Sequence, residues 1–225
     1  MGESVTIFPE EVECGLCGVI STQFIAPPAG KQMGLPDLDT RPAYISTITL
    51  GNRIQYCPNC GYCAPDISIE FPSARETVRG ESYKRVLKSH TLPKMARYFL
   101  AWASLQEAVE EYPGAGWASL NAAWVCDDEE EILQAEHCRQ RAIRNFLQAR
   151  EARRSFSLDT GTEEVLLSDL YRRIGQFAKA KRIGQQGLEL DPDDLITSLL
   201  RFEQMLADQE DRGRHSVNAL PGIQD

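Results

Sequence analysis

Two short cysteine motifs constrain the fold of this chain more than any other feature. The first reads Cys14-Gly15-Leu16-Cys17-Gly18, and the second reads Cys57-Pro58-Asn59-Cys60-Gly61. A two-residue spacer lets one tight turn direct both sulfur atoms to the same point, and the glycine that follows permits the left-handed backbone of such a turn. Two turns of this kind supply four thiolates to one tetrahedral centre. We therefore predict a metal site formed by Cys14, Cys17, Cys57 and Cys60.

Zinc is the metal that this ligand set predicts, with a structural role. Four thiolates leave no open position for water, so hydrolytic chemistry at the metal is not expected. The cysteine-rich first part of the chain is a small module, and modules with such small cores usually need a crosslink. Structural zinc can supply it, since it contributes about 10–16 kcal/mol of folding free energy in small peptides. The stretch between the motifs, residues 18–56, exceeds the usual spacer of about 15–20 residues. The proline- and glycine-rich loop Pro27–Pro42 can absorb the excess, because longer loops add little closure entropy.

Cys63 extends the second motif and raises the alternative of an iron–sulfur cluster. A ferredoxin-type run would next need a cysteine near position 67 followed by proline, whereas this chain has Ile67 and Ser68. The other interpretation is that Cys63 is a small buried residue beside the metal site.

Cys57-Pro58-Asn59-Cys60 also has the form of a thiol oxidoreductase motif. Such a motif opens a helix that follows a strand, but here Gly61 and Pro65 follow closely. The matched cysteine pair at positions 14 and 17 favours the metal over the redox interpretation.

Three further residues, Cys126, His137 and Cys138, fall on predicted helices without a recognised metal-ligand spacing. Buried cysteine is common on helices, so we expect these residues to serve packing rather than a second metal.

The charge and hydropathy of the chain limit its partners. The net charge is −9 over 225 residues, which disfavours DNA and RNA unless basic residues are segregated. The segment Arg139–Arg154 is rich in arginine, whereas acids predominate in residues 1–71. The sequence contains no run of 18 apolar residues, so we predict no membrane span. The first residues lack the basic and apolar segments of a secretory signal. We expect a cytoplasmic protein with reduced thiols.

The first part of the chain, residues 1–71, holds five of the seven cysteines. After a polar leader over residues 1–13, short β-like runs at Val19–Ala26 and Tyr44–Leu50 predict strands, with a turn at Gly51–Asn52. The sequence therefore predicts a small β module of the zinc-ribbon type.

The rest of the chain, residues 72–210, is dominated by residues that favour helices, and residues 211–225 predict a flexible tail. Proline, glycine and polar breaks separate the predicted helices. These lie near 73–89, 93–112, 116–127, 130–156, 163–174, 176–190 and 193–209.

Residues 165–192 resemble a tetratricopeptide repeat. Leu167 and Tyr171 are apolar positions of a first helix, Gly175 allows a tight turn, and Ala180 permits close helix packing. A more degenerate unit begins with Trp117-x-x-Leu120-Asn121-x-x-Trp124. The fold class predicted is mainly α: a short tetratricopeptide-like solenoid preceded by a small β zinc-ribbon module.

The chain is similar to an uncharacterised bacterial family in which a four-cysteine zinc ribbon precedes tetratricopeptide-like helices. The similarity rests on both cysteine motifs, the loop Pro36–Pro42, Trp124 and the repeat at 165–192, and it covers most of residues 12–192. It implies metal binding and a helical scaffold, and it transfers no catalytic residue.

Three classes of function remain open at this point. The first is a protein-interaction scaffold, because stacked helices offer a concave surface to a protein or peptide partner. A nucleic-acid-binding zinc ribbon is the second. The third is an enzyme of unrecognised class, although the sequence shows no Ser/His/Asp, H-E-x-x-H or phosphate-loop pattern and only 3 histidines. We favour the scaffold and expect no catalytic residues.

Overall fold

The computed structural model describes residues 8–25, 34–43, 50 and 53–220. The chain forms two compact units, Met1–Gly30 with Ile45–Ala149, and Lys31–Tyr44 with Arg150–Asp225. These units group the residues differently from the predicted division at residues 71 and 210. That division stays a prediction, because a compact unit need not be an independently folding domain.

Two antiparallel strand pairs form the β part of the first unit. The strands are β1 (Phe8–Glu13), β2 (Ile20–Ile25), β3 (Gln55–Tyr56) and β4 (Cys63–Ala64); β1 pairs with β2, and β3 pairs with β4. The strand predicted at Val19–Ala26 is confirmed as β2. Residues 8–13 of the predicted polar leader form strand β1, which the sequence did not reveal because its side chains are largely exposed and show no alternation of buried and exposed positions. The strand and turn predicted over residues 44–52 lie outside the described residues, except for buried Leu50.

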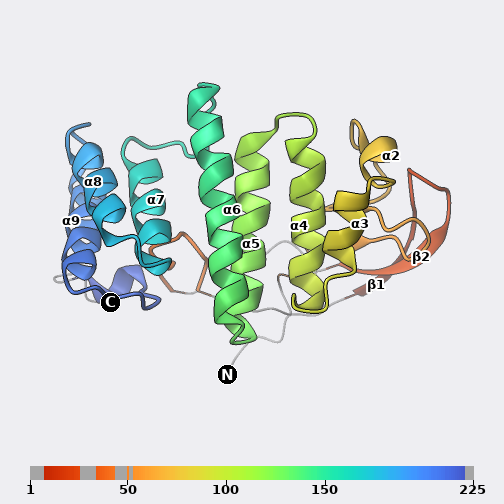
Figure 1. Ribbon diagram of the computed structural model, residues 1–225, viewed down its shortest axis with the longest axis horizontal. Coiled ribbons are helices and arrows are strands. Elements are labelled where there is room, and N and C mark those ends of the chain that lie inside the picture. The colour runs from red at the N-terminus through yellow and green to blue at the C-terminus, as the bar shows by residue number, and fades with distance from the viewer. Residues whose placement is uncertain (1–7, 26–33, 44–49, 51–52, 221–225) are drawn as a thin grey trace. The chain divides into compact units, whose positions relative to one another are not determined.

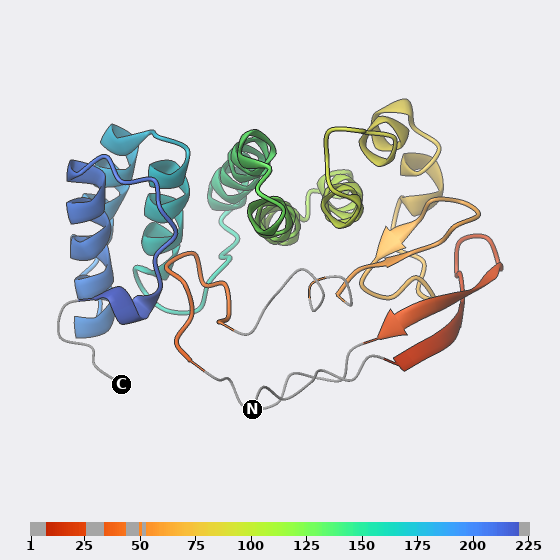
Figure 2. The same ribbon diagram turned by 90° about the horizontal axis from the view of Figure 1, so that it is seen from below.

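Helices follow the strands in the described part of the first unit. They are α2 (Ala74–Thr77), α3 (Glu81–Leu87), α4 (Lys94–Glu107), α5 (Tyr112–Asp128) and α6 (Ile132–Glu151), the last of which extends two residues beyond the unit. Figure 1 shows α4, α5 and α6 side by side, and in Figure 2 they are seen nearly end-on. The helix predicted at 73–89 is two short helices, separated around Gly80, which is the N-cap residue of α3. The chain is therefore mainly helical with small β hairpins before the helices, as the sequence predicted.

A single hydrophobic cluster joins the strands of the first unit to its helices. Cys14 and Cys57 belong to it, together with Ile67, Tyr83 and Leu105. The rings of Tyr56 and Tyr98 stack with their centroids 4.5 Å apart, which links β3 to α4. The cysteine turns thus share their core with α3 and α4.

The second unit contains helices that follow one another as antiparallel pairs. They are α7 (Thr162–Arg173), α8 (Phe177–Leu188) and α9 (Asp194–Asp208), followed by a 3₁₀ helix at Val217–Ala219. Gly175 closes the α7–α8 turn with a φ of 75°. None of the helices in the described ranges is both long and apolar enough to cross a membrane.

The loop around residue 38, read from sequence as a spacer, belongs to the core of the second unit. Leu38 is 2 % exposed and joins the hydrophobic cluster of α7, α9 and the 3₁₀ helix. Asp37 forms an isolated β-bridge with Ser216, and its carboxylate pairs with Arg214 at 2.6 Å. Figure 2 shows this segment, in orange, beside α7.

Arg172 organises a buried ion network that holds the end of the chain. Its guanidinium donates to Glu203 Oε2 at 2.8 Å and to Asp169 Oδ1 at 2.6 Å. It also donates to the carbonyl oxygens of Asp211 and Gly213, at 2.9 and 2.8 Å. The predicted flexible tail therefore has fixed contacts: Arg172 binds its backbone, and Val217 and Leu220 are buried in the hydrophobic cluster of the second unit.

Replacing Leu38 tests the docking of this loop. Leu38→Ala should lower the free energy of unfolding by about 2–5 kcal/mol, because it leaves a cavity in a packed cluster. Leu35→Ala in the same loop, at a side chain 36 % exposed, is the matched control and should change it by less than about 0.5 kcal/mol. Urea denaturation of the two variants measures both effects, and equal losses would contradict the docking.

Candidate metal centre

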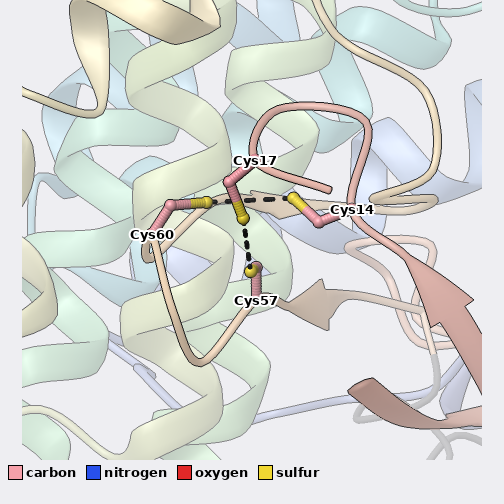
Figure 3. Close-up of side chains that lie close together, drawn as sticks. All are labelled: Cys14, Cys17, Cys57 and Cys60. Atoms are coloured by element: carbon pink, nitrogen blue, oxygen red, sulfur yellow. Dashed lines mark hydrogen bonds between the residues drawn. The ribbon is translucent and has the colours of Figure 1, made fainter. Parts of the chain in front are cut away.

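The structure brings the four predicted cysteines together at one point. All four Sγ atoms lie within 4.8 Å of one another. The Sγ atoms of Cys14 and Cys60 are 3.8 Å apart, and those of Cys17 and Cys57 are 3.6 Å apart. Metal–sulfur bonds of about 2.3 Å give a tetrahedron with sulfur–sulfur edges of about 3.8 Å. Figure 3 shows the four side chains pointing toward one another from two facing turns. The arrangement fits one four-coordinate ion.

The two turns have the same backbone pattern. In the first, the amide of Cys14 donates to the carbonyl of Val19 at 3.0 Å, and the amide of Gly18 donates to the carbonyl of Cys14 at 2.7 Å. In the second, Cys57 donates to Tyr62 and Gly61 donates to Cys57, each at 2.9 Å. Gly18 and Gly61 have φ values of 73° and 78°, the left-handed conformation that the motif predicted.

Hydrogen bonds away from the sulfur atoms also fix the positions of the two turns. The amide of Gly15 donates to the carbonyl of Ile67 at 2.9 Å. The side chain of Gln23, from β2, donates to the carbonyl of Tyr56 at 3.1 Å and accepts from its amide at 3.3 Å. These bonds join residues that are 33 or more positions apart, so the tertiary structure supports the site on both sides.

The sulfur atoms differ in their surroundings. Burial raises the pKa of the Cys14 and Cys60 thiols, because a thiolate loses its hydration in the interior. The side-chain amide of Asn59, 3.5 Å from the Cys17 sulfur, and the backbone amide of Val19 lower the pKa of Cys17 to about 6. Sequence reasoning missed Asn59, whose only signal was its place inside the second motif.

Cys63 lies beside the site and outside the group of four sulfur atoms. Its Sγ donates to the carbonyl of Gly61 at 3.6 Å, and its amide donates to the Tyr83 hydroxyl at 3.1 Å. Complete burial raises the pKa of Cys63 to about 12, so the thiol remains protonated. The interpretation of Cys63 as a small buried neighbour fits this position better than that of a cluster ligand.

The structure also bears on the redox interpretation of the second turn and on the two cysteines of the helices. The Cys57–Cys60 turn connects β3 to β4 and opens no helix, unlike a thiol oxidoreductase motif. Cys126 of α5 and Cys138 of α6 are both buried. The side chain of Cys138, together with burial, raises the pKa of Cys126, which places the two thiols next to each other. Their proximity follows from the packing of α5 on α6, which their sequence spacing does not reveal.

A family model described as "Uncharacterized protein conserved in bacteria (DUF2225)" matches residues 7–192 of the chain. Comparisons with curated proteins and with solved structures returned no match.

Alanine variants of neighbouring cysteines test which sulfur atoms bind the metal. Cys60→Ala should weaken the intense thiolate-to-metal absorption of the cobalt-substituted protein, because each bound thiolate contributes to it and the site loses one of its four donors. Cys63→Ala, three residues away, is the matched control and should keep the full absorption of the parent protein. Weaker absorption in Cys63→Ala, or the full absorption of the parent in Cys60→Ala, would show that the ligand set is wrong.

Proposed function

Because this chain belongs to the uncharacterized bacterial family DUF2225, whose description assigns no activity, we propose a function from the chain's own residues. The protein is a cytoplasmic interaction scaffold in which one structural zinc ion, bound by Cys14, Cys17, Cys57 and Cys60, stabilises a helical surface that binds a protein partner. The observation that carries this proposal is the convergence of four sulfur atoms within 4.8 Å on the core from which the helices start.

The donor chemistry supports zinc. Four thiolates in a tetrahedral arrangement select zinc or iron–sulfur centres. Sulfur atoms within 4.8 Å of one another enclose a single ion and leave no room for the inorganic sulfides of a cluster. A cation also relieves the cost of placing thiolates in the interior, because it compensates their charge directly.

The saturation of the site supports a structural rather than a catalytic role. Four protein ligands leave no position for substrate or water. Cys14 and Cys57 are 1 % and 0 % exposed and belong to the cluster that contains Tyr83 and Leu105. The metal would therefore stabilise α3 and α4 as well as the two turns.

The helical pairs support a repeat scaffold of the tetratricopeptide type. In the α7–α8 pair, the tight turn at Gly175 precedes Ala180, which is fully buried. The hydroxyl of Ser168 donates to the carbonyl of Ala180 at 3.0 Å, which requires a close approach of the two helices. The α4–α5 pair is a second antiparallel hairpin, in the first unit. Short arrays of such pairs present side chains on one face to a partner.

The basic residues of α6 support a protein partner over nucleic acid. Arg139 forms an ion pair with Asp127, and Arg141 contacts the Glu107 carboxylate at 2.8 Å. Arg150 pairs with Glu163 and Glu164, at 3.0 and 2.6 Å. Arginines that pair with carboxylates of the same chain contribute less positive charge to a phosphate backbone than the number of arginines in the sequence suggests.

Removing the metal tests the structural role. Purified protein should contain one zinc ion and no iron per chain by elemental analysis, because four thiolates form a single saturated site. A strong chelator should then lower the unfolding temperature and the far-ultraviolet helical signal, whereas the same chelator saturated with zinc should change neither. A metal-free chain that keeps its unfolding temperature would contradict the proposal.

Cross-linking in the native bacterial host tests the scaffold function. The tagged chain should enrich the same protein in replicate purifications, cross-linked through lysines that the helices present, such as Lys84, Lys94 or Lys181. Enrichment is measured by mass spectrometry against a tag-only control. Recovery of nucleic acid in place of a protein, or of nothing above the control, would reject this function.

A further inference from the structure

A cavity of about 280 Å³ opens between α4, α5 and the segment around the second cysteine turn, all within the first unit. Its main lining residues are Phe99, Trp102 and Gln106 of α4, Trp117 and Asn121 of α5, and Arg53 just before β3. This volume is just below the range of about 300–1,000 Å³ for small-molecule sites, and it matches one or two amino-acid side chains.

Two tryptophan rings, each held by a second aromatic ring that packs against it, form the apolar part of the cavity. Trp102 packs edge-to-face on Phe71, with ring centroids 4.6 Å apart. Trp117 packs in the same way on Phe146, at 5.4 Å. Both tryptophans remain partly exposed although their rings are held in place. Rigid, partly exposed aromatic rings bind an apolar side chain with little loss of conformational entropy.

Two residues that line the cavity, Gln106 and Asn121, each have a buried amide oxygen with no hydrogen-bond donor among the described residues. Asn121 Nδ2 donates to the carbonyl of Trp117 at 2.9 Å, and its Oδ1 is without a partner. Gln106 is 7 % exposed, and its Oε1 is also without a partner. A buried acceptor without a donor costs about 1–3 kcal/mol, so a ligand N–H group gains affinity here once the side-chain amide turns its oxygen toward the cavity.

Arg53 adds a positive charge at the edge of the cavity. Its side chain is exposed, and in the described part of the chain no carboxylate forms an ion pair with it. The cavity therefore combines an apolar interior, two acceptors and a cation. An extended peptide offers the complementary set, since it carries backbone N–H groups between its side chains.

We propose that this cavity binds an extended peptide segment of a partner protein in which an apolar side chain is followed within a few residues by a carboxylate. The apolar side chain lies between Trp102 and Trp117, and backbone N–H groups donate to Gln106 and Asn121. The carboxylate pairs with Arg53. This inference rests on the proposed scaffold function and names the chemistry of its partner.

Labelled synthetic peptides of the form Ser-Gly-Φ-Ser-Z-Gly, with one to three serines between Φ and Z, test the inference by fluorescence anisotropy. With the full-length, metal-loaded protein, peptides with Leu or Phe at Φ and Asp at Z should bind at least about tenfold more tightly than those with Ala at Φ or Lys at Z. Equal binding of the Ala or Lys peptides, or no binding by any peptide, would overturn the inference.

Charge reversal at one exposed arginine gives the specific control. Arg53→Glu should weaken the Asp peptides at least about tenfold and improve the Lys peptides. Arg79→Glu makes the same charge change at an exposed residue outside the cavity and should alter neither. Asn121→Ala should weaken all binding peptides, with an unchanged circular dichroism spectrum as the check on folding. An Arg53→Glu variant that binds as the parent does would overturn the inference.

The same variants separate this inference from the scaffold function. If Arg53→Glu and Asn121→Ala still cross-link to the partner found with the parent chain, the peptide inference fails and the scaffold function stands. If no partner is found with the parent chain and no peptide binds, both fail.

Discussion

The convergence of four cysteine sulfurs is the constraint on which the first unit depends. Thiolates separated by 3.6 to 3.8 Å repel each other strongly, and Cys14 and Cys57 are almost completely buried. The chain can hold such a group only with protons or with a cation at its centre. The two turns favour the cation, because amides of the backbone and of Asn59 already point toward sulfur and stabilise the thiolate form.

Helices α3 and α4 of the first unit contact the second cysteine turn and the strand beside it directly. The Tyr83 hydroxyl of α3 donates to the carbonyl of Gly61 at 3.0 Å and accepts from the amide of Cys63. Tyr98 of α4 stacks on Tyr56, next to Cys57. Phe71, which follows the second turn, packs on Trp102 at the proposed peptide cavity. Side chains in direct contact therefore connect the candidate metal centre to the cavity.

The sequence predicts best those features that are encoded locally. The cysteine set follows from the spacing within each motif, and the helices follow from apolar periodicity between glycine and proline breaks. Strand β1 escaped prediction because its exposed side chains need no alternation. The neighbouring thiols of Cys126 and Cys138 depend on how α5 packs on α6, which no local pattern specifies. Asn121 was assigned to a degenerate repeat, but its unpartnered oxygen at the cavity emerges only from the folded helix.

The long spacer between the cysteine motifs shows how an apparent excess of chain can have a structural cause. From the sequence alone, the proline- and glycine-rich segment is a loop without a structural role, and its length costs the metal site little closure entropy. In the fold, Leu38 is part of the core of the second unit, and Asp39 and Arg41 are each 2 % exposed. The amide of Leu38 donates to the carbonyl of His215 at 3.0 Å, and the amide of Val217 donates to the carbonyl of Pro36 at 2.9 Å. The middle of the spacer therefore belongs to the packing of the second unit, whereas the two cysteine turns that flank it belong to the first unit.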